Sequence, residues 1–408
     1  MAAPGTGRLE GALDEPQSGV AARRSIPFSR PTIGEEEIEE VVRCLRSGWI
    51  TAGPLTARFE KDFAAYVGAA HALAVSSATA GLHLAMLALG LEAGDEVVTS
   101  PMTWPATINA ILIAGGTPVF ADIEPQTLNL DAEAVKRKLG PRTRAILPVH
   151  FAGQPCDIDQ LLDLARPRGI AIVEDAAHAI GTELRGRRIG GLDTEAAIFS
   201  FHPIKNITTA EGGMVTTGDA DFAHRVRLFR FHGVERDAWK AYGRPEVPRY
   251  DVVVPGLKYN LTDLQSALGV TQLGKLEAFI ARRAALARRY DKALADLEEV
   301  RPLGRVPYPH RHAHHIYVVR LATERLTVDR DGFISDLQAA GVSVGLHFTA
   351  AHELSYYRKR LGDHAADLPV ATEASQKILS LPLYPSLTDE DQEYVIDAIQ
   401  RIVRARRR

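Results

Sequence analysis

The chain lacks the features that mark several broad classes of protein. It has 408 residues but only two cysteines, Cys44 and Cys156, and neither lies in a CxxC or zinc-binding spacing. This excludes a disulfide framework. No apolar run approaches the ~20 residues that cross a bilayer, so we expect no membrane partner. Residues 1–25 contain no apolar core of the signal-peptide kind, and we therefore expect a cytoplasmic protein.

An excess of charge of one sign is also absent. Lysine and arginine number 48 against 51 aspartates and glutamates, which gives a formal net charge of -3. The chain has no general basic field to hold nucleic acid, so we expect no nucleic-acid partner and only local anion sites. The arginine-rich stretch 401–408 is interpreted as the solvated end of a helix.

Between residues 70 and 217 short apolar runs alternate with helical stretches. Nearly continuous apolar runs are typical of strands that are covered on both faces. The alternation predicts an α/β fold, with a mostly parallel or mixed seven-stranded sheet in an α/β/α large domain and a site at the carboxyl ends of the strands. The predicted strands are 71–76, 96–99, 117–122, 144–150, 170–174, 196–201 and 213–217. The predicted helices are 79–89, 106–114 and two that start at Asp131 and Asp157.

The pattern changes after Asn260, where a long helix over 261–297 is predicted. A smaller C-terminal α+β domain follows. We expect a disordered tail at 1–24, a large domain at 25–270 and a small domain at 271–408 that starts in the long helix. Residues 301–309, rich in Gly and Pro, are a further candidate boundary. The small domain is predicted to contain strands 316–321 and 342–346 and helices 330–340 and 389–403.

Three segments carry residues suited to chemistry, and the first is 75–82, VSSATAGL. A strand ends here, and a turn rich in hydroxyl groups opens a helix. The free N–H groups and the helix dipole favour an anion, so Ala78 and Thr79 are candidate phosphate donors. A plain helix cap is the alternative interpretation of this segment taken alone.

The second segment is 170–179, IAIVEDAAHA, in which an apolar strand delivers Glu174, Asp175 and His178 at its carboxyl end. A carboxylate at this place can pair with a heterocyclic nitrogen and keep it protonated. A helix-capping aspartate is the alternative interpretation.

The third segment is 197–213, AIFSFHPIKNITTAEGG, which places Lys205 just beyond another apolar strand. A lysine in apolar surroundings has a lowered pKa and can form a Schiff base. Ser200 and His202 flank it. A solvated surface lysine is the ordinary alternative, but the neighbours Phe199–Ile204 are largely apolar.

Together the three segments follow the order that pyridoxal 5′-phosphate (PLP) needs. The first would hold the phosphate, Asp175 the pyridine nitrogen and Lys205 the aldehyde. Trp104, in SPMTWPATIN, is a candidate to stack on the ring.

The chain resembles the DegT/StrS family of PLP-dependent nucleotide-sugar aminotransferases from about residue 26 to 402. The resemblance rests on ordered motifs, among them SGWITAGP, SSATAGLH, GDEVVTSPMTW, EDAAHAIGT, FSFHPIKNITTAEGG, KYNLTD and GLHFTAAH. It implies a fold-type I PLP-dependent transferase. The SPMTW, FHPIKNIT and GLHFTAAH segments are most similar to the UDP-4-amino-4-deoxy-L-arabinose aminotransferases.

The resemblance also implies roles for particular residues. Lys205 would be the Schiff-base lysine and Asp175 the partner of the ring nitrogen. Asn260 would reach the cofactor of a neighbouring subunit, which implies a homodimer with shared sites. The implied phosphate contacts are Ala78, Thr79 and Ser200, and the implied ring contacts are Trp104 and His178. The implied substrate-side residues are Gly48, Trp49, Ile50, Thr51, His202, His347, Phe348 and His352.

The implied reaction moves an amino group from L-glutamate to the C4 keto group of a nucleotide-linked sugar, preferably a UDP-4-keto pentose. Its product would serve lipopolysaccharide or antibiotic biosynthesis. The alternatives are the same chemistry on a dTDP- or UDP-linked 4-keto-6-deoxyhexose or on a 3-keto sugar, and a non-catalytic PLP-binding regulatory homologue. The retained Lys205 disfavours the dehydratases of the family, in which a histidine replaces this lysine.

Two further patterns invite a functional interpretation. The histidine-rich run 310–315 suggests a metal site, but no carboxylate or cysteine joins it, so core or interface histidines are the preferred interpretation and no metal is expected. Lys240 and Arg244 are suited to clamping a diphosphate across a dimer. A surface loop is their default interpretation.

Overall fold

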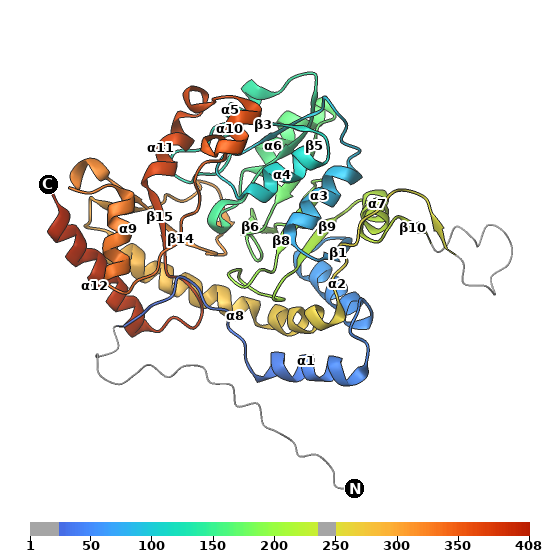
Figure 1. The fold of residues 1–408 in the computed structure, drawn as a ribbon, viewed down its shortest axis with the longest axis horizontal. Helices are drawn as coiled ribbons and strands as arrows, with labels where there is room; N and C mark the ends of the chain where they lie inside the picture. Colours follow the sequence, from blue (N-terminus) through green and yellow to red (C-terminus); the bar gives the residue numbers. More distant parts are fainter. Residues whose placement is uncertain (1–23, 236–249) are drawn as a thin grey trace, which may run out of the picture.

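The computed structural model describes residues 24–235 and 250–408 (Figure 1). The expected tail therefore lies outside the described residues except for Arg24, and so do Lys240 and Arg244. Among the described helices, none combines the length and the apolar character that crossing a bilayer requires.

All seven strands predicted for the large domain are present in one sheet. Its order is β1-β9-β8-β5-β4-β2-β3, and β9 runs antiparallel to both of its neighbours while the other pairs are parallel. The prediction of a mixed, mostly parallel seven-stranded sheet is confirmed. The strands are β1 His71–Val75, β2 Glu96–Thr99, β3 Thr117–Phe120, β4 Thr143–Leu147, β5 Ala171–Asp175, β8 Ala196–Ser200 and β9 Gly213–Thr217.

Successive side chains of a strand point to opposite faces of the sheet. In this sheet both faces are buried, each in its own core. On β8, Ala197 and Phe199 belong to one core, whereas Ala196 and Ile198 belong to the other. The first core is closed by α2 Pro54–Val67, α5 Ala132–Lys138, α6 Ile158–Ala165 and part of α8 Asp263–Leu294, and the second by α3 Ala78–Ala88, α4 Pro105–Ile113 and α7 Ala220–Arg230. This arrangement explains why these strands have no alternating polar residues in the sequence.

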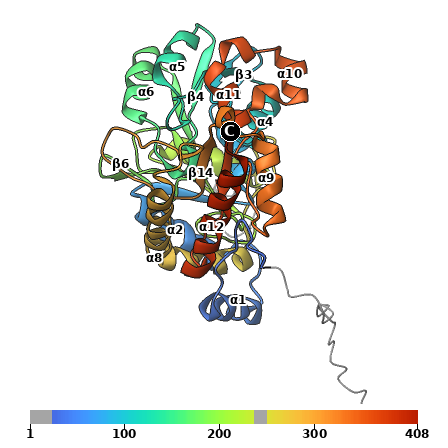
Figure 2. The same ribbon diagram turned by 90° about the vertical axis from the view of Figure 1, so that its left-hand side faces the viewer.

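The smaller C-terminal part is built on an antiparallel sheet of order β12-β14-β15, namely Val300–Pro302, Tyr317–Leu321 and Ile378–Leu381. Its core also contains residues of α9 Arg330–Ala339 and α12 Asp389–Arg406. Helix α8 serves both parts, since Phe279 packs in the large core and Leu286 in the small one. Figures 1 and 2 show α8 running from beneath the large sheet to α12.

Several elements differ from the sequence predictions. The predicted strand 342–346 is reduced to single bridges, from Val342 to Ile26 and from Gly345 to Ser380. The last bridge of this segment is at Gly345, and the next residues, Leu346–Phe348, line a cavity. Residues 301–302 belong to β12, so the candidate boundary at 301–309 starts inside the small sheet. The sequence analysis did not predict α1 Glu35–Ser47, α2, α7, α10 Ser355–Leu361, α11 Pro369–Lys377 or β15.

Candidate active site

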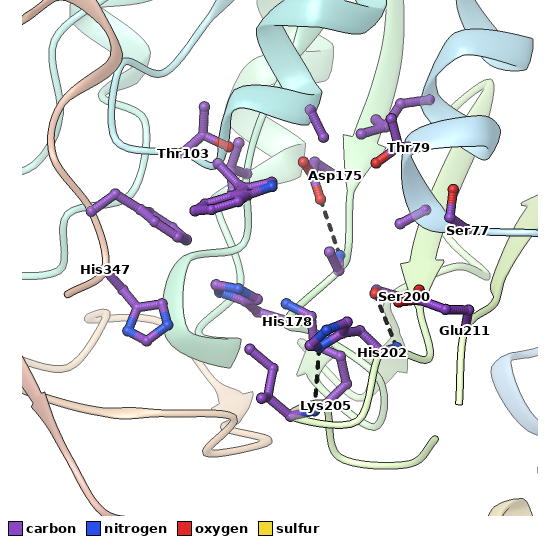
Figure 3. Close-up of a pocket in the computed structure, with 18 of the residues that line it drawn as sticks. Ser77, Thr79, Thr103, Asp175, His178, Ser200, His202, Lys205, Glu211 and His347 are labelled. Atoms are coloured by element: carbon purple, nitrogen blue, oxygen red, sulfur yellow. Dashed lines mark hydrogen bonds between the residues drawn. The ribbon is translucent and has the colours of Figure 1, made fainter. Parts of the chain in front are cut away.

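A cavity of about 480 Å³ opens at the carboxyl ends of β5 and β8, beside the start of α3 (Figure 3). It brings together residues from all three segments that the sequence analysis selected. The lining residues are Ser77, Ala78, Thr79, Leu82, Thr103, Trp104, Ala106, Val149, Asp175, Ala177, His178, Ser200, His202, Ile204, Lys205, Glu211, Leu346, His347 and Phe348.

One wall of the cavity is the N-terminus of α3. The Ser77 side chain caps the helix by accepting a hydrogen bond of 3.0 Å from the Ala80 N–H. The N–H groups of Ala78 and Thr79 precede the first intrahelical bonds, so they are free for a ligand. Because these donors also lie at the positive end of the helix dipole, this wall is suited to a phosphate.

Asp175 lines the cavity at the end of β5, close to Thr79 (Figure 3). The Thr107 hydroxyl donates to Oδ2 at 2.7 Å, and the Ala177 N–H donates to Oδ1 at 3.1 Å. Burial raises the pKa of Asp175, although these two hydrogen bonds and the charge of Lys205 act to lower it. A carboxylate accepts about four hydrogen bonds, so Asp175 retains capacity for an N–H donor in the cavity.

Behind Asp175 lies a buried pair that the sequence analysis did not predict. Glu174 points to the other face of β5 and accepts hydrogen bonds from His150 Nε2 at 2.8 Å and from the Thr194 hydroxyl at 2.6 Å. The Cys156 N–H donates to His150 Nδ1 at 3.0 Å. Since Nδ1 accepts, the imidazole proton lies on Nε2 and points at Glu174.

Lys205 projects from the loop that follows β8. Its backbone N–H donates to the carbonyl of His202 at 2.8 Å (Figure 3), and the next side chain, Asn206, donates from Nδ2 to the carbonyl of Ala313 at 2.9 Å. These contacts fix the loop on both sides of the lysine. Burial lowers the pKa of Lys205 to about 8, while the charge of Asp175 acts to raise it.

Aromatic rings line one side of the cavity. His178 stacks on Phe348 with ring centroids 5.8 Å apart, and Trp104 lies 6.2 Å from Phe348. Trp104 is 63% exposed, so one of its faces is open to a ligand. His347 Nδ1 lies 3.0 Å from the Ser380 hydroxyl, and burial lowers the pKa of this histidine to about 4.

Most of the residues that the sequence analysis selected line this cavity. They are Ala78, Thr79, Trp104, Asp175, His178, Ser200, His202, Lys205, His347 and Phe348. The lining residues Ser77, Thr103, Glu211 and Leu346 were not predicted as site residues, although each lies within one of the selected motifs. The analysis also missed Thr107, which is one helical turn beyond Thr103 and bonds to it at 2.7 Å.

The structure places other selected residues outside the cavity lining. The segment 48–51 is exposed at the end of α1, where Trp49 is 55% and Ile50 51% exposed. The carbonyl of Thr51 accepts from the Asp263 N–H at 3.0 Å, which holds this segment against the start of α8. Asn260 pairs with Val75 at the edge of the sheet and accepts a hydrogen bond from Lys258 Nζ at 2.6 Å.

His352 is a correction to the predicted substrate residues. It is only 2% exposed, lies outside the cavity lining and bonds through Nε2 to the Thr372 hydroxyl at 2.9 Å. The motif predicts that its chain segment runs near the site, but the turn Ala351–Glu353 directs this side chain into the core.

The histidine run 310–315 is distributed over several environments. His312 and His314 stack with centroids 4.0 Å apart, whereas His315 packs against His178 at 4.3 Å. Within 24–235 and 250–408, no group of three or more His, Cys, Asp or Glu side chains is arranged to hold a metal ion.

Comparison with known proteins assigns the class. A sequence model of the DegT/DnrJ/EryC1/StrS aminotransferase family matches residues 31–400. The chain belongs to this family. Its members include PLP-dependent sugar aminotransferases, and the chain is accordingly an enzyme of this type.

Solved structures support the assignment to the DegT/DnrJ/EryC1/StrS family. Spr1654 of Streptococcus pneumoniae has a TM-score of 0.87 and 32% identity, covering 93% of this chain and 99% of that one. TlmJ of Streptoalloteichus hindustanus, an aminotransferase, has a TM-score of 0.85 and 34% identity, covering 93% and 99%. PseC of Helicobacter pylori, an aminotransferase involved in pseudoaminic acid biosynthesis, has a TM-score of 0.86 and 28% identity, covering 94% and 100%. Spr1654 is known in both PLP and PMP forms.

The residues of this chain fit PLP. A Cβ added to Gly213 would lie 2.7 Å from the Ala78 nitrogen, so the Gly213 backbone packs directly against the start of α3 and leaves no room for a side chain there. Asp175 retains unused acceptor capacity inside the cavity, and Lys205 lines the same cavity with a lowered pKa. A phosphate, a protonated ring nitrogen and an aldehyde therefore each have a matching group.

Proposed function

We propose that this protein transfers the amino group of L-glutamate to the C4 keto carbon of a nucleotide-linked sugar, with a UDP-4-keto pentose as the preferred acceptor. The observation that carries the proposal is the common cavity of Asp175 and Lys205 beside the bare N-terminus of α3. The pentose rests on the resemblance of the SPMTW, FHPIKNIT and GLHFTAAH segments to the aminoarabinose enzymes.

In this proposal the N–H groups of Ala78 and Thr79 and the hydroxyl of Ser200 hold the phosphate of PLP. Trp104 and His178 flank its ring. When bound, PLP supplies a carbonyl for the amino group and an electron sink for the bond that is broken. The protein residues then decide where protons are held and moved.

Lys205 moves the proton. Its pKa of about 8 leaves a useful fraction of the amine uncharged near neutral pH. Nζ can therefore take a proton from the Cα of the amino-acid donor and deliver it to C4′ of the cofactor. The same group reverses these steps when the keto sugar is the acceptor.

Asp175 holds a proton at the ring nitrogen of the cofactor. Its burial removes competing water, and the Thr107 hydroxyl and the Ala177 N–H fix both carboxylate oxygens. A fixed negative charge in a low-dielectric site stabilises a protonated nitrogen strongly. By keeping that nitrogen protonated, Asp175 would strengthen the electron-withdrawing effect of the bound cofactor and so lower the barrier for proton removal by Lys205.

The substrate side of the cavity is formed by Trp104, His202, Leu346, His347 and Phe348. His347 is kept neutral by its low pKa, and its Nδ1 is engaged by Ser380. It therefore offers Nε2 to a sugar hydroxyl without adding charge. The rings of Trp104 and Phe348 offer apolar faces to the sugar ring.

A second subunit completes the site in this proposal. The cavity lining described above contains no arginine and no lysine besides Lys205, although glutamate and a nucleotide diphosphate are anions. Asn260 and the segment 48–51 lie outside the lining, and the latter exposes the large apolar side chains of Trp49 and Ile50. We assign these residues to a homodimer interface, where Asn260 and residues 48–51 enter the partner's site.

Absorbance of the holoenzyme tests the proposed function. L-Glutamate should discharge the band of the lysine-bound cofactor, and 2-oxoglutarate should appear. After removal of the donor, a UDP-4-keto pentose should restore the band. Restoration by a dTDP-4-keto-6-deoxyhexose alone would overturn the pentose assignment, and a band that glutamate never discharges would overturn catalysis with this donor.

A further inference from the structure

His315 lies behind the cavity wall in an environment that leaves its ring unengaged. It is 1% exposed, and neither Nδ1 nor Nε2 has a hydrogen-bond partner among the described residues. Its ring centroid lies 4.3 Å from that of His178, whose Nδ1 is likewise without a partner there. Two enclosed imidazoles therefore face each other with three nitrogens available.

The backbone around His315 is held firmly. The N–H of Ala313 donates to Gly153 at 3.2 Å, and the N–H of His315 donates to Ala152 at 3.1 Å. The backbone is also closely packed here. A Cβ added to Gly153 would lie 3.3 Å from the backbone nitrogen of His315 and 3.0 Å from the carbonyl oxygen of His178. The large-domain loop and the histidine segment are thus in direct backbone contact.

Two side chains donate hydrogen bonds to the backbone carbonyls of the segment 313–315. Asn206, the neighbour of Lys205, donates to the Ala313 carbonyl at 2.9 Å. Arg283 of α8 is buried and donates from Nη1 to the His315 carbonyl at 2.9 Å and to the Leu383 carbonyl at 2.8 Å. The segment is therefore tied to the lysine loop, to α8 and to the small domain.

We propose that His315 is a positioning residue that fixes the tautomer and the orientation of His178, and that it acts on the reaction only through His178. This inference rests on the proposed function. His178 lines the cavity while its Nδ1 is enclosed, so Nε2 is the nitrogen left for a ligand. Whether Nε2 donates or accepts depends on which role Nδ1 has toward His315.

The electrostatics of the pair agree with this role. Burial, and then the positive charge of Lys205, hold the pKa of His178 well below its usual range. Burial, His178, Lys205, Arg283 and His347 do the same for His315. Both rings are therefore neutral, and each has one N–H and one lone pair. The rings are 4.3 Å apart and tilted by 42° without a hydrogen bond between them, and the inference requires a rotation about the Cβ–Cγ bonds that brings a donor of one ring to an acceptor of the other.

A double-mutant cycle on the holoenzyme tests the inference. The proteins are the unsubstituted chain, His315→Phe, His178→Phe and the double variant. Three quantities are measured: the PLP dissociation constant, the pH dependence of the lysine-bound cofactor's absorbance, and the single-turnover rate with L-glutamate. We expect His315→Phe to slow the turnover roughly tenfold or more and to shift the absorbance transition, but to have little effect when His178 is already Phe.

Two further variants separate positioning from general damage. His315→Gln keeps a donor and an acceptor, so it should recover most of the rate. His312→Asn alters the same segment and keeps an acceptor for the His314 N–H, which donates to His312 Nδ1 at 2.9 Å, so it should leave all three quantities within about twofold of the unsubstituted protein. If His315→Phe does not fold, the cycle is run with His315→Leu, which likewise has neither a donor nor an acceptor.

The inference would be overturned if His315→Phe slowed the turnover equally with His178 and with Phe at position 178. It would also be overturned if His315→Gln kept the pH profile of the unsubstituted protein but recovered none of the rate. If L-glutamate does not discharge the band of the unsubstituted protein, the proposed function fails instead. The PLP dissociation constants and the absorbance titrations of the same proteins still decide the role of His315 in that case.

Discussion

The backbone of Gly213 lies directly against the nitrogen of Ala78, at the start of α3, so that a Cβ on Gly213 would be 2.7 Å from this atom. Real Cβ atoms essentially never approach backbone this closely. This contact places the first residue of β9 against the helix N-terminus that is proposed to hold the cofactor phosphate. A side chain at Gly213 would displace the donors themselves.

Gly213→Ala should therefore weaken PLP binding by roughly tenfold or more, since misplaced donors lose charge-assisted hydrogen bonds worth about 1.5–3 kcal/mol. The PLP dissociation constant measured by fluorescence checks this. Gly218→Ala is the matched control, because a Cβ there has nothing within 4 Å. An unchanged affinity in Gly213→Ala would show that this helix end does not hold the phosphate.

Thr107→Val removes the hydroxyl that bonds to Asp175 Oδ2 and keeps the shape of the side chain. This hydrogen bond lowers the pKa of Asp175, so its loss should raise that pKa further and weaken the hold on the ring nitrogen. We expect kcat to fall about tenfold, consistent with a loss near 1.4 kcal/mol. Thr99→Val, which loses a buried hydrogen bond to the Leu147 carbonyl, is the control and should retain kcat.

Lys205→Ala should abolish turnover in the proposed reaction. The pH dependence of covalent PLP capture by the apoprotein gives a second measurement, because only the uncharged amine reacts. Capture should rise with pH around the lowered pKa of about 8. Since the charge of Asp175 raises that pKa, Asp175→Asn should move the rise to lower pH. A rise near the ordinary lysine pKa of about 10.4 would contradict the burial of Lys205.

Hybrid dimers test whether Asn260 acts across an interface. Lys205→Ala and Asn260→Ala subunits should each be nearly inactive when assembled alone. In a mixed dimer one site combines an intact Lys205 with an intact Asn260 from the partner, so random mixing should recover up to about a quarter of the full activity. No recovery after verified subunit exchange would place Asn260 in its own subunit's site or outside both sites.

Glu174→Gln should destabilise the protein without direct contact to the cavity. His150 Nε2 and the Thr194 hydroxyl both donate to Glu174, so an amide NH₂ in place of one oxygen would oppose a donor. An unsatisfied buried donor costs about 1–3 kcal/mol, measurable by urea unfolding. Glu133→Gln on an exposed helix start is the control and should stay within about 0.5 kcal/mol.

The sequence predicted the large sheet well for a physical reason. Strands buried on both faces are continuous apolar runs, as at Ala196–Ser200, and polar capping residues separate them from helices. Helix α1 was not predicted, although its apolar residues Ile38, Val41, Val42 and Leu45 recur at helical spacing. Only Glu37 and Cys44 of this helix are buried, so the apolar stripe marks a helix but not a part of the core.

The candidate site was predicted where one motif fixes both position and direction, as at the end of β5 for Asp175. It was not predicted where direction depends on tertiary packing. His352 lies near the site in the chain but points into the core, whereas His315 points to His178 from a distant segment. No local sequence pattern distinguishes these two histidines. The direction of each side chain depends on how the C-terminal part packs on the rest of the chain.

Helix α8 extends without interruption for 32 residues, with Phe279 in one core and Leu286 in the other. If one core unfolded, the other would lose part of its packing, because α8 would have to unfold near its middle. Unfolding should therefore be a single cooperative event for both parts, with one heat-absorption peak. The pocket at their junction then persists or collapses together with the entire fold.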